Sequence, residues 1–124
     1  MPGIARLSVV ALDTTDPQRL ARFYRDLTGW EIDHDDPDWV QLRSDQGVAL
    51  AFQLAPDHRP PAWPDPAHPQ QLHLDLEVAD LDRAEEQVLA IGARKASVQP
   101  GTSFRVFLDP AGHPFCLVRA ATAP

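Results

Sequence analysis

The sequence predicts an α+β fold built from two copies of one unit, in which a strand is followed by a helix and then by three strands. The clearest copy begins in residues 71–92, where Leu72, Leu74, Leu76 and Val78 alternate with polar residues, as expected for a strand with one buried face. A pattern of helical spacing follows directly and stops at a glycine. Residues 6–29 have the same order, so the chain contains this strand–helix plan twice.

A constant offset between unlike landmarks indicates an internal duplication. Gly29 and Gly92 each end a predicted helix and lie 63 residues apart, and the same offset separates Phe52 from Phe115. We therefore expect a single domain of residues 1–124, with modules at 4–54 and 71–119 and a connector at 55–70.

The first module is predicted to start with a strand at residues 4–12. Asp16 is expected to cap the helix, with Pro17 at its first position, where the missing N–H costs nothing. Leu20, Phe23, Tyr24 and Leu27 then form its apolar stripe. The three strands that follow are expected at 30–33, 39–43 and 48–54, with turns at 34–38 and 44–47.

The connector contains six prolines and no glycine, valine, isoleucine or leucine, which excludes a helix or a central strand. Two interpretations remain open: a stiff linker between the modules, or a loop whose Trp63 folds over a site. A ring as large as Trp63 is seldom left in water, which favours a packing or pocket-lining role.

In the second module either Asp80 or Asp82 could cap the helix. Strands are expected at 93–98, 104–108 and 113–119, and the sequence of residues 109–112, DPAG, is typical of a hairpin turn. His113 is expected at the surface beside this turn. Residues 1–3 and 120–124 are expected to be loose ends.

The polar face of the strand at 72–78 carries His73, Asp75 and Glu77. Three ionisable side chains on one sheet face of a small protein indicate a solvated cleft rather than a second dry core. The alternative is an ordinary outer face exposed to solvent.

The composition restricts the function classes. A net charge of −7 without a cluster of Lys or Arg argues against nucleic acid and anionic membranes as partners. No apolar run approaches the roughly 20 residues of a spanning helix, and the start does not resemble a signal peptide. The single Cys116 fits a reducing compartment, so we expect a cytoplasmic protein.

Three segments carry a resemblance to a known family: DPQRLARFYRDLTGWE, QLHLDLEVADLDRAEEQVLAIGA behind the Pro-Trp loop, and FLDPAGHPFCLV. Together they resemble the vicinal oxygen chelate superfamily of glyoxalases, bleomycin resistance proteins and dioxygenases, and more narrowly its small glyoxalase-like members from actinobacteria. The resemblance spans roughly residues 4–119. It implies two βαβββ modules related by pseudo-twofold symmetry, with curved sheets enclosing a cleft and helices outside.

The resemblance also implies where a metal would sit in the metalloenzymes of the superfamily. One ligand comes from the first strand and one from the last strand of each module. These positions read His73 and Cys116 in the second module, and Gln53 with a residue between Ser8 and Val10 in the first. The family places His or Glu there. Gln53 offers only a neutral carbonyl, and Ser8 or Val10 offers no strong donor, so no bound cofactor is expected, although a divalent metal stays open as the alternative. His73 is the candidate ligand, and Asp75 on the same strand face is a further contributor to consider.

The single residues have structural interpretations as well. His73 could be a hydrogen-bonded histidine of the sheet, and Cys116 an inert thiol in an apolar strand. A Cys116–His73 nucleophile pair would lack an accompanying oxyanion hole, so no residue is assigned a catalytic role.

The expected function is that of a glyoxalase or bleomycin-resistance type protein that binds a small organic, aromatic molecule, for sequestration of a drug or for a metal-independent conversion. The ligand-binding cleft is expected to include His73, Asp75, Gln53, Cys116, Ser8, Trp39 and Trp63. The alternative is a lyase, isomerase or dioxygenase that uses a divalent metal; a scaffold without a ligand is a third class. A homodimer is expected, because open sheets leave apolar edges and symmetric dimers are the commonest closed oligomers.

Overall fold

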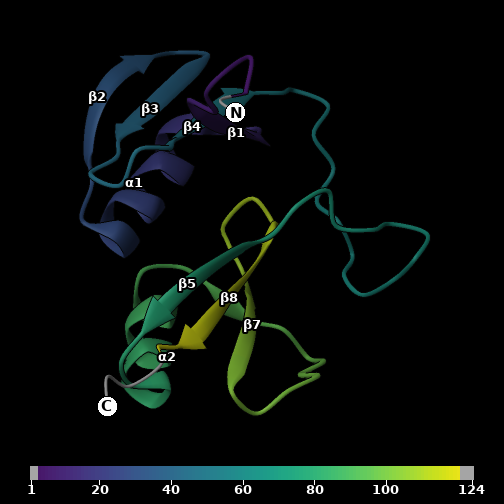
Figure 1. Ribbon diagram of the computed structural model, residues 1–124. Coiled ribbons are helices and arrows are strands. Elements are labelled where there is room, and N and C mark those ends of the chain that lie inside the picture. Colours follow the sequence, from purple (N-terminus) through teal and green to yellow (C-terminus); the bar gives the residue numbers. More distant parts are fainter. Residues whose placement is uncertain (1–2, 121–124) are drawn as a thin grey trace. The chain divides into compact units, whose positions relative to one another are not determined.

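The computed structural model of the protein describes residues 3–120 and divides into two compact units, one on each side of the bond between His58 and Arg59 (Figure 1). Each unit contains one four-stranded sheet and one helix, in the predicted order. The chain therefore has an α+β fold with two similar modules. Their union into one domain with pseudo-twofold symmetry stays a prediction.

The first unit consists of β1 (Val9–Thr14), α1 (Pro17–Thr28), β2 (Glu31–Asp36), β3 (Trp39–Arg43) and β4 (Ala49–Leu54). Its sheet has the order β1-β4-β3-β2. Strand β1 runs parallel to β4, whereas the pairs β3–β4 and β2–β3 are antiparallel. The last strand of the module therefore lies beside the first.

The second unit repeats this topology with β5 (Leu74–Val78), α2 (Leu81–Ala90), β6 (Arg94–Lys95), β7 (Phe104–Leu108) and β8 (Pro114–Arg119). Its order is β5-β8-β7-β6, with β5 parallel to β8. Both sheets are open, because the two edge strands of each sheet have one neighbour apiece. A cleft shared by the two sheets stays a prediction.

The helix ends follow from their capping residues. The Asp16 carboxylate accepts a hydrogen bond from the Arg19 amide at 3.1 Å, and Pro17 occupies the first turn as predicted. Gly29 ends α1 in the left-handed conformation, with φ of 77° and its N–H bonded to the carbonyl of Arg25. In the second unit the cap is Asp80, which accepts from the Arg83 amide at 3.2 Å.

The two hydrophobic cores are centred on the pair of phenylalanines that share the 63-residue offset. Phe52 on β4 and Phe115 on β8 are both fully buried. Phe52 stacks on Tyr24 of α1 with ring centroids 5.4 Å apart, and Phe115 stacks on Phe107 of β7 at 5.7 Å. Phe52 and Phe115 thus occupy equivalent positions in the hydrophobic cores of the two modules.

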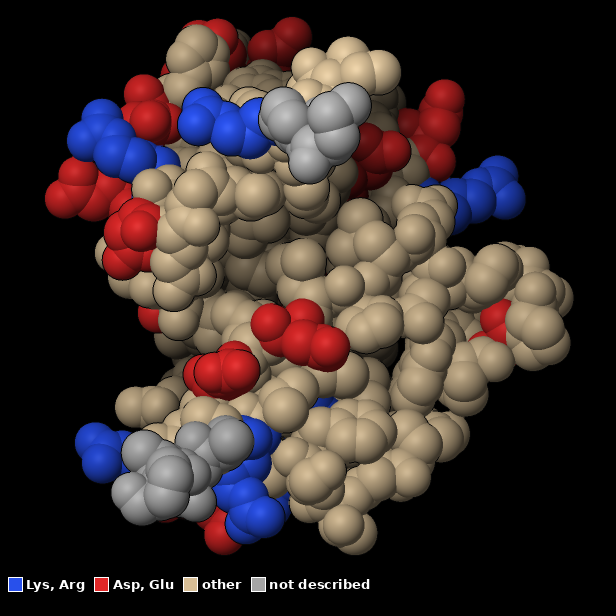
Figure 2. Space-filling model, in the orientation of Figure 1, with Lys and Arg blue, Asp and Glu red and all other residues tan. Residues whose placement is uncertain are grey.

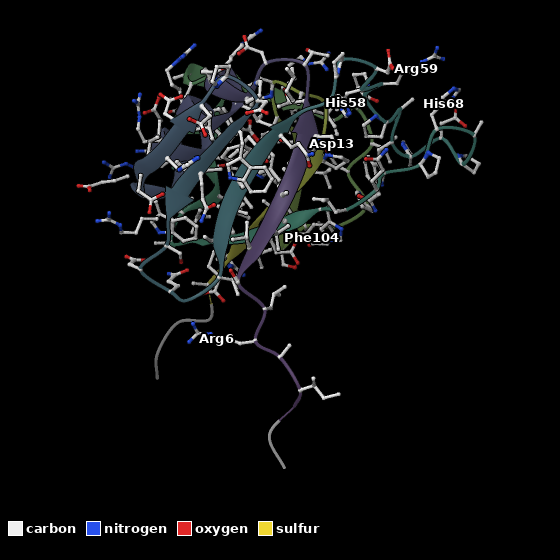
Figure 3. All side chains as sticks on the ribbon, turned by 90° about the horizontal axis from the view of Figure 1, so that it is seen from above. Arg6, Asp13, His58, Arg59, His68 and Phe104 are labelled. Atoms are coloured by element: carbon white, nitrogen blue, oxygen red, sulfur yellow. The ribbon has the colours of Figure 1, made fainter. Side chains whose placement is uncertain are left out.

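The start of the first module differs from the prediction. Strand β1 begins at Val9, and residues 3–8 form an extended arm in which Ile4 is fully exposed and Leu7 is 65% exposed. Figure 3 shows Arg6 on this arm, which leads away from the first sheet. Only the carbonyl of Ser8 continues the strand pairing, since it accepts from the Ala49 amide at 2.9 Å.

The predicted turn at residues 34–38 was too long. Strand β2 continues to Asp36, with a bulge between Ile32 and His34, and the chain reverses at residues 37–38. A strand so rich in acidic residues is accommodated because β2 is the outer strand of its sheet and keeps those side chains in solvent.

The strand predicted at 93–98 is reduced to two residues. Beyond Lys95 the Ala96 amide still donates to the Val106 carbonyl, and then the side chain of Gln99 replaces strand pairing. Its amide nitrogen donates to the carbonyls of Ala96 and Val106, and its oxygen accepts from the Val106 amide. An amide side chain offers the same donor and acceptor as a backbone peptide, so the ladder ends early without leaving these groups unpaired.

His113 is buried rather than at the surface. It is 1% exposed because the DPAG turn folds inward around Asp109, whose carboxylate accepts from the amides of Ala111 and His113. Gly112 of the same turn, at φ of 89°, lies against the connector, since a Cβ there would come within 2.5 Å of Pro60. The connector thus contacts the second module at Pro60.

The surface carries both basic and acidic side chains, as the composition predicts. On the face shown in Figure 2, basic side chains are interspersed with acidic ones and form no extended basic surface. Among the described residues no helix is long and apolar enough to span a bilayer. Residues 1, 2 and 121–124, which belong to the predicted loose ends, lie outside the described part of the chain.

Candidate functional site

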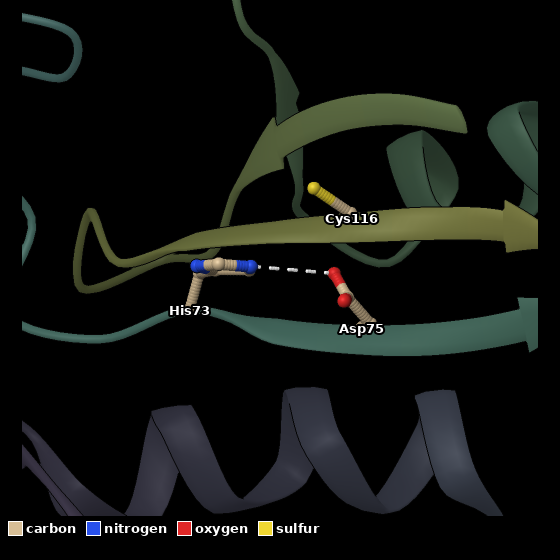
Figure 4. A group of neighbouring side chains, drawn as sticks. All are labelled: His73, Asp75 and Cys116. Carbon is tan, nitrogen blue, oxygen red and sulfur yellow. Dashed lines mark ion pairs between the residues drawn. The ribbon is translucent and has the colours of Figure 1, made fainter. Parts of the chain in front are cut away.

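The parallel pairing of β5 with β8 brings three potential ligands together. Asp75 is the direct partner of Cys116 in this register, and His73 precedes the first residue of β5 by one position. The donor atoms of His73, Asp75 and Cys116 all lie within 4.8 Å of one another (Figure 4). His73 was predicted within the strand; it lies just outside it, yet on the same face as Asp75.

The cluster has one close polar contact between two exposed side chains. Nε2 of His73 lies 3.5 Å from Oδ1 of Asp75. Both side chains are about half exposed, at 45% and 59%, so water screens this contact and it contributes little to stability. The contact places the Asp75 carboxylate next to one ring nitrogen of His73.

Cys116 is a buried thiol of low reactivity. It is 9% exposed and packs with Ala96 and Val106. Burial, and then the charge of Asp75 and its hydrogen bond, raise the pKa of the thiol to about 11. The side chain is therefore protonated at neutral pH, which disfavours a nucleophilic role.

An apolar pocket of about 160 Å³ adjoins the cluster within the second module. Its lining consists of Trp63, Gln70, His73, Pro100, Phe104, Val106, Pro114 and Cys116. Trp63 and Phe104 pack against the buried residues around Cys116. The connector thus supplies one wall, which agrees with a Trp63 folded onto a site and not with a free linker.

The aromatic wall opposite the connector depends on a glycine. A Cβ at Gly101 would overlap the ring of Phe104, so only glycine allows the ring to lie against this loop. The predicted site residues did not include Phe104, Val106, Gln70 or the two prolines of the lining. The Pro100–Gly101 pair ahead of an aromatic residue was the available signal.

The candidate residues of the first module lie at two separate places. Trp39 and Gln53 are partners across β3 and β4, and the Trp39 indole donates to Gln41 at 3.2 Å. Ser8 lies beyond the opposite end of β1, because Gln53 pairs with Asp13 while Ser8 precedes Val9. The structure therefore does not bring Ser8 to Gln53.

Strand register also corrects the equivalence between the modules. Phe52 pairs with Leu12, and Phe115 pairs with Leu74, so the first strands correspond at an offset of 62. Ala11, rather than Ser8 or Val10, is then equivalent to His73, and Asp13 is equivalent to Asp75. The repeated Leu-Asp pair in ALDTTD and HLDLEV was the signal for this alignment.

The three side chains of the cluster can be compared with the ligands of a zinc site. Imidazole, carboxylate and thiolate are zinc ligands, and ligand atoms around tetrahedral zinc lie about 3.5 Å apart. His73 and Asp75 meet this spacing, but the set as a whole spreads over 4.8 Å. The three side chains would have to draw closer together to hold an ion, so as they stand they do not form a preformed metal centre.

Comparison with known proteins agrees with this architecture. A family model described as a glyoxalase-like domain matches residues 9–118. None of the curated proteins compared with the chain matches it.

Solved structures share the fold at low identity. A glyoxalase/bleomycin resistance protein/dioxygenase family enzyme from Burkholderia phytofirmans is 19% identical, with a TM-score of 0.73 over 94% of this chain and 100% of that one. The fosfomycin resistance protein FosX from Listeria monocytogenes is 15% identical, with a TM-score of 0.71 over 96% of both chains. TnmS3, an antibiotic binding protein from Streptomyces sp. CB03234, is 18% identical, with a TM-score of 0.62 over 98% and 100%. At these identities the likeness concerns the fold.

Proposed function

Since the chain belongs to the glyoxalase-like domain family, within the vicinal oxygen chelate superfamily, we propose that it binds a small organic molecule through an aromatic ring, without a metal. The observation that carries this proposal is the apolar pocket of the second module, walled by Trp63 and Phe104. Pockets with apolar walls and a few polar groups are the usual sites of small ligands.

The size of the pocket limits what enters it. An apolar cavity of about 150 Å³ accepts benzene in an engineered protein, so 160 Å³ suits one ring of the ligand. Drug-sized molecules need about 300 Å³ or more. A larger ligand would place one ring in the pocket, which His73 helps to line, and the remainder outside it.

The biological role that fits is sequestration of an aromatic natural product or drug in the cytoplasm. Two proteins of the same fold, TnmS3 and FosX, are an antibiotic binding protein and a fosfomycin resistance protein. The protonated thiol of Cys116 supports binding over covalent chemistry. A metal-independent conversion of the bound molecule is the variant of this proposal that involves catalysis.

Fluorescence titration tests the proposal directly. A panel of planar natural products and antibiotics should include a compound that quenches tryptophan emission saturably. Trp63→Ala should weaken that compound at least tenfold and leave the protein folded, because the ring is half-buried at the rim of the cluster. Trp30→Phe is the matched control, since the Trp30 indole bonds Asp45 in the first unit and does not line the pocket. Collapse of the thermal transition with affinity intact would make Trp63 a structural residue and refute its role in binding.

The second candidate is a divalent-metal lyase, isomerase or dioxygenase, favoured only by the proximity of His73, Asp75 and Cys116. Protein purified without chelator should contain well under one equivalent of Zn, Ni, Mn or Fe per chain. One equivalent that disappears in His73→Ala would reverse the order of the two candidates.

The same proposal includes self-association of the chain. The exposed Ile4 and Leu7 on the arm before β1 are apolar groups that a second copy could cover. A homodimer is the simplest closed assembly that would bury them.

A further inference from the structure

The pocket of the second module has a floor and a rim that differ in polarity. Three of its lining residues are buried, and we call them the floor: Val106, Pro114 and Cys116. The other five lining residues are half-buried or exposed and form the rim, which includes the polar side chains of Gln70 and His73. A ring that enters the pocket therefore has one end on the floor and the other end near the rim.

The backbone of Val106 is not available to a ligand, because the side chain of Gln99 already occupies it. The Val106 amide donates to Oε1 of Gln99 at 2.9 Å. The Val106 carbonyl accepts from Nε2 of Gln99 at 2.8 Å and from the Ala96 amide at 3.0 Å. A carbonyl oxygen has two lone pairs, so both are used.

The remaining groups of the floor are poor hydrogen-bond partners as well. Pro114 has no N–H, and the side chains of Val106 and Pro114 are hydrocarbon. The thiol of Cys116 is only a weak donor and a weak acceptor. Among the described residues that line the pocket, the side chains that form strong hydrogen bonds therefore belong to the rim.

This division penalises a polar group at the inner end of a bound ring. A hydroxyl placed on the floor would lose its water and gain no strong partner, which costs binding free energy, and a charged group would cost far more. The same substituent at the rim keeps its contact with solvent. A hydrocarbon end on the floor meets no such penalty and gains the free energy of burial.

From this arrangement we infer that the ligand enters with an unsubstituted or alkyl-substituted end of its ring and carries its polar groups at the opposite end. The ligand class is thus an amphiphilic aromatic molecule that is polar at one end only. Val106 is the specificity-determining residue, since its side chain is 3% exposed and Gln99 fixes its backbone. This inference rests on the proposed function and specifies the ligand class of the same site.

Three para-substituted benzenes of nearly equal size test it: p-xylene, p-cresol and hydroquinone, titrated by calorimetry under nitrogen at pH 7, where the phenols are uncharged. The first exchange of methyl for hydroxyl, from p-xylene to p-cresol, should weaken binding by less than about fivefold, because the hydroxyl can lie at the rim. The second exchange, from p-cresol to hydroquinone, should weaken it by roughly twentyfold or more, because one hydroxyl must then lie on the floor.

Val106→Thr tests the floor itself, because threonine has the shape of valine and adds a hydroxyl there. In this variant the second exchange should weaken binding severalfold less than in the native protein, and p-xylene should bind more weakly. Val118→Thr is the matched control, since Val118 packs against the same buried residues but does not line the pocket. It should leave the effects of both exchanges unchanged.

The outcomes separate the inferred ligand class from the proposed function. If the two exchanges weaken binding equally, or hydroquinone binds best, the inferred ligand class is wrong while the ring pocket stands. If Val106→Thr does not fold, the three titrations of the native protein decide alone. If none of the three rings binds, and Trp63→Ala changes no titration, the proposed function itself fails and the inferred ligand class fails with it.

Discussion

Asp75 lies next to both His73 and Cys116, and its charge acts on the Cys116 thiol. For Cys116 the effect has a clear sign, because a nearby carboxylate disfavours the thiolate in the same direction as burial does. Cysteines that serve as nucleophiles require the opposite environment. The residue is thus better described as a protonated member of the pocket wall.

The rate of alkylation by iodoacetamide reports the protonation of the Cys116 thiol. The rate for Cys116 should rise with pH towards a midpoint of about 11 in the native protein. Asp75→Asn removes the nearby charge, so the midpoint should move down and the rate at pH 8 should increase severalfold. Asp13→Asn, at the equivalent position of the first module, is the matched control. A native midpoint near the ordinary 9.0 would contradict the assigned environment.

The residues of the site were only partly predictable. Alternation placed His73 and Asp75 on one strand face, whereas Cys116 was expected only from the resemblance to the superfamily. Ser8 was misplaced because the two modules differ in length: the cap of α1 follows Leu12 by four residues, whereas the cap of α2 follows Leu74 by six. A single offset of 63 could not align both the helices and the first strands.

Among the elements, the loop before β7 determines the shape of the pocket. Gly101→Ala would place a methyl group where the Phe104 ring lies. The ring must move, so ring binding should weaken at least tenfold, with a loss of about 1–3 kcal/mol in unfolding free energy from overpacking. Ligand titration and urea unfolding measure the two effects.

Ser103→Ala is the control for this loop. Its side chain is exposed, and only its backbone carbonyl takes part in pairing, where it accepts from the Arg119 amide. Affinity and stability should both stay within error of the native protein. Unchanged affinity in Gly101→Ala would mean that Phe104 is not a wall of the binding pocket.

Strands with a clear period or a run of buried residues were predicted well, and those with exposed side chains were not. Strand β3 matches its prediction at both ends, since Val40 and Leu42 are buried while their neighbours are not. Strand β2 shows no alternation because nearly all of its side chains are exposed, and β6 stops where a glutamine side chain replaces its pairing. A side chain that takes the place of a backbone hydrogen-bond partner leaves no periodic pattern in the sequence.

At the scale of the whole molecule, the prediction is a homodimer. Light scattering should give twice the 13.7 kDa of one chain, because Ile4 and Leu7 would otherwise remain in water. Ile4→Ser combined with Leu7→Ser should weaken the dimer at least tenfold. Arg6→Ser, on the same arm, should have little effect. A mass of one chain that does not change with concentration would reject the assembly.

Strand pairing within the described residues has a consequence for how such a dimer could arise. Every pair in both sheets joins strands of the same module, with the first strand of each module beside its last. The connector is bonded to the first module through the Ala55 amide and the Thr14 carbonyl, and it contacts the second module at Pro60, so the residues between these two points link the units. Two chains could therefore exchange whole modules by domain swapping without breaking a single backbone pair between strands.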